Sequence, residues 1–402
     1  IRRLVTMSQT DFHYQKKELP ANLTKFSLVV LAIGVVLSLI AFFVDRERAL
    51  FSYLVTYMMI VSIAVGSLFI VALEYIAGAD WSTPIRRIPE FFSRLLPLLF
   101  ILVIPLLVFN HDLFHWAHKE AVAEDKILQG KAPYLNITFF VIRTFVFIGL
   151  WSLFYWVLIR NSRKQDTTKD QNLTTKNIRL SAIFILVFAI SITFTAIDFM
   201  MSLEPHWFST IYGVYFFSGI VVAALAAITL AVIMLKERGY FSPWMTDDHL
   251  FSLGALIFAF INFWAYIAFS QYLLIWYADL PEETFWFLTR WNGNWAYLSI
   301  LLIIVQFLVP YFALLTQPSK KDPKRLKFIS IWLLFAHFID LFWLIMPNMN
   351  SMKDGYVFSW IDFVFPIAGV GLIILVFIIS YKKDNLLPIG DPKLKRGMDF
   401  HL

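Results

Sequence analysis

The feature that most restricts the fold of this chain is a series of long apolar runs separated by short polar segments. As a helix, an apolar run of about 18 residues or more can cross a hydrocarbon core of about 30 Å. Only 15% of the 402 residues are charged, against about 25% in soluble domains, and the mean hydropathy is +0.69. Since backbone groups inside a bilayer must be hydrogen-bonded within the protein, the sequence predicts an all-α, polytopic membrane protein.

The apolar runs predict ten transmembrane helices, with boundaries accurate to about three residues. The predicted spans are 24–44, 49–77, 90–110, 134–159, 178–201, 210–235, 249–276, 292–316, 328–346 and 361–381. The first span is too long for the apolar core of a signal peptide, and it is followed by the charged residues 45–48 instead of small ones. We therefore expect it to be an uncleaved span.

Basic residues are distributed unequally between the two sides of the predicted membrane. Of the 34 lysines and arginines, 26 lie on the side that holds the N-terminus, 7 lie on the other side, and Arg143 lies within a span. The positive-inside rule makes the first side, called side A here, cytoplasmic and side B periplasmic, with both termini cytoplasmic. Because the basic residues alternate between loops, the net charge of +6 does not indicate a nucleic-acid partner.

Two predicted spans end with the same pattern, an Ile-Asp pair that precedes a proline by seven positions. Asp198 precedes Pro205 in this way, and Asp340 precedes Pro347. Spans 2–5 and spans 6–9 thus form two sets with the same orientation, which predicts two four-helix bundles with spans 1 and 10 peripheral. The alternative is that two aspartates match by chance. The predicted divisions are a cytoplasmic N-terminal segment 1–23, peripheral span 1 in 24–48, a first bundle 49–209 with a periplasmic loop 110–133, a second bundle 210–360, peripheral span 10 at 361–381 and a cytoplasmic tail 382–402.

Several ionisable residues lie at predicted membrane depth, where a charge is expensive and is usually functional. At about 1.5 Å of helix per residue, four of them fall in the half of the membrane near side B: Arg143, Asp198, His337 and Asp340. His337 and Asp340 share one helix face. Facing helices could bring Arg143 against one of the aspartates. The interpretations are a structural ion pair, a proton relay or a polar pocket for a quinone headgroup.

Glu74 lies about one turn from the side-A end of the second predicted span. It is either an acid at the membrane interface or a point of proton uptake. Asn262 and Gln306 lie near mid-membrane and could extend a polar path from side A.

Sites for metals and redox groups have little support in the sequence. His111, His115 and His118 would share one face of a helix, and this spacing can bind a metal. We favour an interfacial helix in residues 110–133, because no other side-B segment supplies a cluster of ligands. A transmembrane haem needs two axial histidines within spans, and only His337 qualifies. The chain has no cysteine and no phosphate-binding loop, dinucleotide fingerprint or catalytic triad pattern, so we predict no catalytic, cofactor or metal site.

Three stretches carry a resemblance to one family: IDFMMSLEPHWFSTIYGVYFFSG, FSQYLLIWYADLPEETFWFLTRWNGNW and HFIDLFWLIMP. They resemble the membrane subunits of alternative complex III, the bacterial quinol:cytochrome c (or quinol:oxidase) oxidoreductase, which are similar to the NrfD and polysulfide-reductase type of membrane anchor. The ten spans and doubled bundle also fit this family. With 402 residues and short terminal segments, the chain resembles the smaller of the two such subunits, the F subunit.

The resemblance implies a place in the bacterial inner membrane and several partner subunits. These are a second NrfD-like membrane subunit, an iron–sulfur subunit and c-type cytochrome subunits, with a terminal oxidase as a further partner. Quinol would be the substrate of the complex, while haem c and iron–sulfur clusters would lie in the partners. Proton conduction through polar residues is also implied, and the match supports Asp198, His337 and Asp340 as such positions. Arg143 and Glu74 are candidates on their own chemistry alone.

The sequence therefore favours a non-redox membrane subunit of a respiratory oxidoreductase that scaffolds the complex and conducts protons. The alternative is a stand-alone proton-coupled secondary transporter, which also uses repeats and buried acids. Transporters usually bind substrate at mid-membrane between broken helices. Here the ionisable residues are displaced toward side B, which argues against a transporter.

Overall fold

A computed structural model describes residues 16–241, 244–352 and 358–402, and in these residues the regular structure is helical throughout. Residues 1–15 of the predicted N-terminal segment and Lys353 lie outside the described residues. The described part contains ten helical segments long and apolar enough to cross a membrane, which confirms the predicted all-α polytopic class. The segments are α1 (Ala21–Val44), α2 (Arg46–Ala77), the broken segment Thr83–Val108, α9 (Ile137–Thr168), α10 with η4 (Asn172–Leu203), α11 (Tyr212–Glu237), α12 (Asp247–Ala278), the broken segment Trp295–Ala313, α17 with η6 (Pro323–Asn348) and α18 (Ile361–Lys383).

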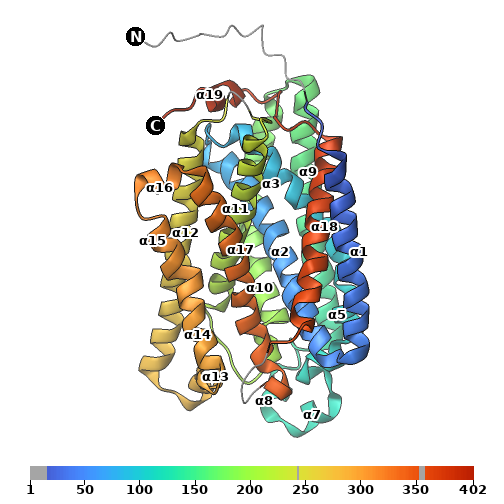
Figure 1. The fold of residues 1–402 in the computed structure, drawn as a ribbon. Coiled ribbons are helices and arrows are strands. Elements are labelled where there is room, and N and C mark those ends of the chain that lie inside the picture. The colour runs from blue at the N-terminus through green and yellow to red at the C-terminus, as the bar shows by residue number, and fades with distance from the viewer. Residues whose placement is uncertain (1–15, 242–243, 353–357) are drawn as a thin grey trace.

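The segments run side by side in one elongated bundle (Figure 1). The short C-terminal helix α19 (Leu394–Met398) lies at one end, and α13 (Pro281–Trp291) lies at the other end with the loop helices α7 (Lys119–Glu124) and α8 (Lys126–Lys131). The end that holds α19 is side A of the sequence analysis, and the end that holds α13 is side B.

The centre of the bundle is formed by α2 and α11, the first helices of the two predicted sets and the most buried of the ten segments. They contact each other, and α11 also contacts α12 and α17 of its own set. Gly66 of α2 permits the close approach, because a Cβ atom there would lie 2.7 Å from the Ala224 side chain. The two sets therefore share one continuous core.

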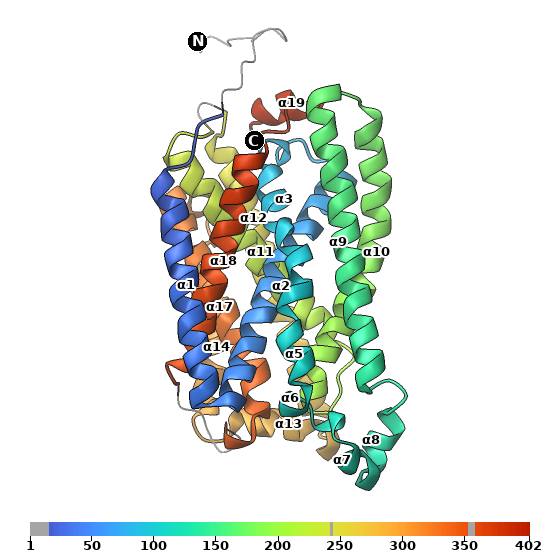
Figure 2. The same ribbon diagram turned by 90° about the vertical axis from the view of Figure 1, so that its right-hand side faces the viewer.

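The predicted peripheral spans, α1 and α18, pack against each other at the edge of the bundle (Figure 2). A Cβ atom at Gly34 would lie 2.4 Å from the backbone of Ala368, and one at Gly371 would lie 2.6 Å from the backbone of Leu31. Small residues let transmembrane helices approach closely where no hydrophobic effect drives their association. Most of the remaining surface of α1 is exposed, as expected for a helix that faces lipid.

Two spans are irregular, at positions where proline removes a backbone donor. The third passes from α3 (Arg87–Phe92) through the 3₁₀ turn η2 (Ser93–Leu98), which contains Pro97, to α4 (Leu99–Leu102) and α5 (Ile104–Val108). The eighth has α14 (Trp295–Ile303), then the π-helical turn η5 (Ile304–Leu308), then α15 (Val309–Ala313) with Pro310. The side chain of Trp332 donates a hydrogen bond to the Val305 carbonyl oxygen in this turn.

Loop 110–133 differs from the prediction of an interfacial helix. It consists of α6 (Asn110–Leu113), the 3₁₀ turn η3 (His115–Ala117), α7 (Lys119–Glu124) and α8 (Lys126–Lys131). The chain is extended at Phe114, His118 and Asp125, so these pieces do not share one axis. The 3.6-residue pattern of short segments could not reveal these breaks.

Candidate functional site

The structure brings Arg143 of α9 against Asp198 of α10. Arg143 donates from Nε to Asp198 Oδ2 at 3.0 Å and from Nη2 to Oδ1 at 2.8 Å. The Tyr134 hydroxyl donates to the same carboxylate at 2.9 Å. Both charged side chains are buried. Bidentate pairing with a third donor satisfies the carboxylate, as a buried charge requires.

Asp340 of α17, the matching acid of the second set, has neutral partners. The Tyr215 hydroxyl of α11 donates to Oδ1 at 2.5 Å, and the Trp264 indole nitrogen of α12 donates to Oδ2 at 3.2 Å. Among the described residues, no lysine or arginine forms an ion pair with Asp340. The residue is 1% exposed. A carboxyl in this position has hydrogen bonds but no compensating positive charge.

His337 lies between Asp340 and the central helix α2. Its Nε2 atom is 3.0 Å from Ser62 Oγ, and the Ser62 hydroxyl donates to the Met58 carbonyl oxygen at 2.8 Å. Since that hydroxyl uses its only hydrogen, it accepts from His337, and the neutral ring carries its proton on Nε2. The Nδ1 atom has no hydrogen-bond partner among the described residues and lies 4.0 Å from Asp340 Oδ2.

The space around this imidazole depends on Gly219 of α11. A Cβ atom at that position would lie 3.0 Å from His337 Cε1 and 3.5 Å from Asp340 Oδ2. Glycine therefore leaves room beside both ionisable groups.

Glu74 lies within one turn of the side-A end of α2, inside the protein. It is buried near the side-A end of α2 and pairs with Arg86 at 3.3 Å. Arg86 also pairs with Asp391 of the C-terminal tail at 2.5 Å and lies 3.7 Å from Glu90 Oε1. The C-terminal tail thus lies against the side-A end of α2.

A second arginine extends this group of charges. Arg87 pairs with Glu90 and with Asp166 of α9, each at 2.5 Å. Four carboxyl groups therefore share two guanidinium groups in one buried cluster, with Lys393 as a more distant positive charge. Of these residues, only Glu74 was a candidate from the sequence. The adjacent arginines Arg86 and Arg87, just before Pro89 and Glu90, are the sequence signal for the rest of the cluster.

A small cavity of about 140 Å³ lies beside Glu74 and Arg86, between α2, the start of the third span, α11 and α12. Its other walls are mainly apolar and include Trp81, Leu225 and Leu253.

The two polar groups lie at different depths along the central helix. Ser62 and Glu74 are 12 residues apart in α2, which corresponds to about 18 Å. Between them, the Ser67 hydroxyl of α2 and the Thr229 hydroxyl of α11 are buried and have no hydrogen-bond partner among the described residues.

Asp198 and Asp340 are not brought together, because each bonds within its own set of helices. Asn262 donates to the Phe258 carbonyl oxygen of its own helix. Gln306 lies in the π-helical turn, buried, with neither side-chain polar atom hydrogen-bonded among the described residues. The structure thus joins His337 to Asp340 and Arg143 to Asp198 but leaves Asn262 and Gln306 outside both groups.

The three stretches that carry the family resemblance meet at side B. The rings of Trp207 and Trp286 stack with centroids 4.4 Å apart and planes 11° apart, and Trp286 packs edge-on against Trp343 at 5.3 Å. The Trp207 indole nitrogen donates to the Glu283 carbonyl oxygen at 3.0 Å. One buried aromatic cluster therefore links segments that lie far apart in the sequence.

Arg290, which the sequence analysis did not identify, holds this cluster to the end of α17. Its guanidinium carbon lies 3.4 Å from the centroid of the Trp286 ring, and it donates to the carbonyl oxygens of Trp343 and Leu344 at 3.1 and 2.9 Å. A cation at these carbonyls complements the negative end of the helix. Burial lowers the pKa of Arg290 to about 9, so the side chain is charged at neutral pH.

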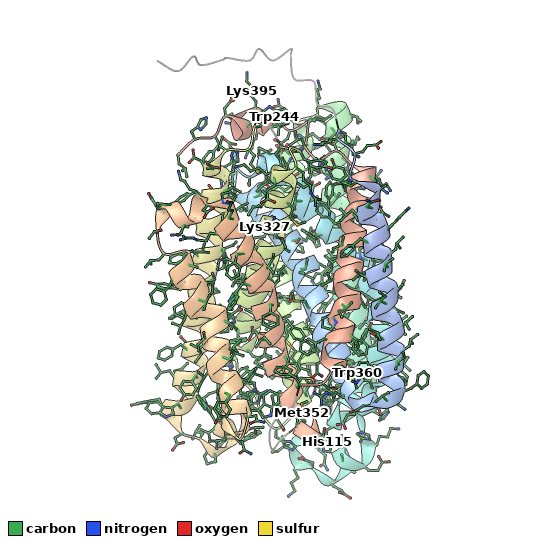
Figure 3. All side chains as sticks on the ribbon, viewed as in Figure 1. His115, Trp244, Lys327, Met352, Trp360 and Lys395 are labelled. Carbon is green, nitrogen blue, oxygen red and sulfur yellow. The ribbon has the colours of Figure 1, made fainter. Side chains whose placement is uncertain are left out.

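The histidines of loop 110–133 lie on consecutive short elements and not on one helix face. His118 Nε2 is 2.8 Å from the His111 carbonyl oxygen, while the rings of His115 and His118 are 6.5 Å apart. Figure 3 shows His115 at the opposite end of the molecule from Lys395. In the part of the chain that the structure describes, no group of three potential ligands is arranged to hold a metal ion.

Comparisons with protein-family models and with curated proteins find no match for this chain. The fold, the buried contacts and the resemblance of the three sequence stretches are therefore the basis for the function proposed below.

Proposed function

We propose that this chain is a non-redox integral membrane subunit of a respiratory quinol:cytochrome c (or quinol:oxidase) oxidoreductase of the alternative complex III type. It would scaffold the complex in the bacterial inner membrane, with both termini cytoplasmic, and conduct protons. The observation that best supports proton conduction is that His337 and Asp340 are buried side by side and that, among the described residues, Asp340 has no lysine or arginine partner. The resemblance of three sequence stretches supplies the identity of the complex.

The geometry at His337 and Asp340 suits transfer of a proton between neutral groups. A protonated Asp340 would give its proton to Nδ1 of His337, which forms a carboxylate and an imidazolium. The imidazolium would then release the Nε2 proton toward Ser62, and the neutral ring would return in its other tautomer. The gap of 4.0 Å between Nδ1 and Oδ2 is longer than a hydrogen bond, so a small movement or one water must close it.

The buried cluster at side A supports a second role, that of storing a proton. Four carboxyl groups against two guanidinium groups would leave negative charge uncompensated if every carboxyl ionised. Repulsion and burial both favour the neutral form of a carboxyl group. A proton held here could move toward Ser67 and Ser62 along α2 when water enters.

The aromatic cluster at side B supports the scaffolding role. Its buried tryptophans fix α13 onto the ends of two spans, while Trp276, Tyr277 and Trp291 are exposed on the adjacent surface. Exposed aromatic side chains are enriched at protein interfaces and at membrane interfaces. Iron–sulfur and c-type cytochrome subunits would contact this side.

The proposal is tested by tagging the chain in its native host and purifying it in a mild detergent. We expect it to co-purify with haem absorbance, iron–sulfur centres and quinol-oxidising activity. Isolated from its partners, it should show no visible absorbance and no quinol oxidation. A colourless preparation that drives proton-dependent solute uptake into liposomes would contradict the proposal and support the transporter, for which the cavity beside Glu74 would be the candidate substrate site.

A further inference from the structure

A basic hollow lies on the outer surface of α9 near side A. It encloses about 400 Å³ and is lined by Tyr155, Trp156, Ile159, Arg160, Arg163 and Lys164. These residues form two adjacent rows along the helix, spaced by four residues in each row. The hollow is separate from the cluster at Glu74 and from the pair His337–Asp340.

Positive charge exceeds negative charge in the hollow. Three of its six lining residues are cations: Arg160, Arg163 and Lys164. Arg163 forms an ion pair with Asp384, at 2.7 Å. Arg163 Nε is buried and has no hydrogen-bond partner in the described part of the chain. The same holds for Nη1 of Arg94, a residue close enough to act electrostatically on Asp384. Buried guanidinium donors without acceptors favour an added anion.

The hollow lies at the depth of lipid headgroups. Arg160 is 23 residues after the first residue of α9, about 35 Å along the helix, which is beyond a hydrocarbon core of about 30 Å. Toward the membrane centre, Leu153 and Trp156 are 53% and 55% exposed. The Arg160 guanidinium carbon lies 4.9 Å from the centroid of the Trp156 ring. Cations thus lie directly above an apolar surface that faces lipid.

We propose that this hollow binds an anionic phospholipid. The phosphodiester group would accept charge-assisted hydrogen bonds from Arg160, Arg163 and Lys164, and the acyl chains would lie along Leu153 and Trp156. Basic pockets beside transmembrane helices are suited to such headgroups, and each cation near the surface adds to the attraction. An acidic segment of a partner protein would satisfy the cations but would leave the apolar surface below them without a matching group.

The test uses the purified protein in nanodiscs of phosphatidylcholine, into which phosphatidylglycerol is titrated and retained lipid is measured by native mass spectrometry. We expect phosphatidylglycerol to bind at least about tenfold more tightly than phosphatidylcholine. The double variant Arg160→Gln, Lys164→Gln should lose most of this preference. Both side chains are exposed, so the variant should fold, and an unchanged unfolding temperature without phosphatidylglycerol would establish that it does.

Matched controls distinguish binding at this hollow from non-specific attraction of anionic lipid to the basic surface. Lys176→Gln removes an exposed cation from the adjacent helix α10 and should leave the lipid preference unchanged. Glycerol 3-phosphate, which has the headgroup chemistry without acyl chains, should not displace the lipid at millimolar concentration. The proposal is overturned by equal binding of the two lipids, by equal loss in the control variant or by displacement with glycerol 3-phosphate. Zero-length cross-linking of Lys164 to a carboxylate of a partner subunit would also overturn it.

Discussion

Asp198 and Asp340 occupy the same position before a proline in the two halves of the protein, yet within the described residues only Asp198 has a guanidinium partner. Arg143 donates two hydrogen bonds to Asp198, whereas Asp340 accepts from a tyrosine and a tryptophan. The repeated pattern thus produces two different electrostatic situations. One is suited to holding helices together, and the other to exchanging a proton.

We expect Arg143→Gln to destabilise the protein by about 3–5 kcal/mol, because it leaves the buried Asp198 carboxylate without a positive charge. In the double variant Arg143→Gln, Asp198→Asn, both charges are absent, so the combined loss should be clearly smaller than the sum of the single losses. Thermal or denaturant unfolding in detergent measures these differences. Additive losses would show that the two side chains act independently.

The sequence was sufficient to predict the class of fold and the number of spans, because both depend on apolar length alone. The sequence also predicts that Arg143, Asp198, His337 and Asp340 lie in one half of the membrane, which stays a prediction. It could not predict which aspartate Arg143 would pair with, since this depends on how α9 rotates against α10. Nor could it predict the contact of Asp391 with Arg86, which joins residues 305 positions apart. Loop 110–133 was predicted wrongly because breaks at single extended residues leave no periodic signal.

Substitutions of different residues in the buried charge cluster at side A should destabilise the protein to different extents. Arg86→Gln leaves three carboxyl groups without their shared partner and should destabilise the protein by about 3–5 kcal/mol. Glu74→Gln removes one of the surplus acids and keeps an acceptor for Arg86, so its cost should be about 1 kcal/mol or less. Unfolding in detergent compares the two variants. A larger cost for Glu74→Gln would mean that all four carboxyl groups are ionised and needed.

The pH dependence of loop 110–133 should reflect Asp125, which lies outside the spans. Its hydrogen bond with His206, at 2.5 Å, holds the pKa of this carboxyl below its ordinary value of 3.8, and the backbone amides of Leu128 and Ile127 contribute. An acid with a lowered pKa stabilises the folded form above its unfolded pKa, and this contribution is lost as the pH falls through the lowered pKa. We therefore expect the protection of the loop amides against hydrogen exchange, expressed relative to the unfolded rate at each pH, to fall steeply below about pH 4.

Asp125→Asn is the matched control for this pH dependence. Asparagine is an equally good N-cap, so the variant keeps the helix cap but removes the charge facing His206. The loop amides should then exchange faster at neutral pH, with a weaker change on acidification. An unchanged profile in Asp125→Asn would show that the cap, and not the ion pair, holds the loop.

The orientation in the membrane can be tested directly, because the natural chain contains no cysteine. Single cysteines at Lys169 and at Glu120 lie in loops on opposite sides. From the excess of basic residues on side A, we expect an impermeant thiol reagent to label Glu120→Cys in intact cells once the outer membrane is permeabilised. Lys169→Cys should react only after the cells are broken. The reverse pattern would place side A outside.

The proposed proton path is tested most sharply at Asp340 and His337, in the proposed complex. Asp340→Asn keeps an oxygen that can accept from Trp264 and an amide that can donate to the Tyr215 hydroxyl, but it cannot exchange a proton, so the number of protons translocated per electron should fall more than the yield of complex. His337→Phe fills the same space without a titratable nitrogen and should have the same effect, whereas Asp198→Asn should have a weaker one.

Trp264→Phe is the control, because it removes a hydrogen bond to Asp340 but no group that carries protons. It should lower the unfolding temperature slightly and leave the proton-to-electron ratio unchanged. The ratio, the quinol turnover and the yield of complex must be measured for all four variants, since a lower yield alone reduces total activity. Normal coupling with poor yield in both Asp340→Asn and His337→Phe would make this pair a structural contact between α17, α11 and α2.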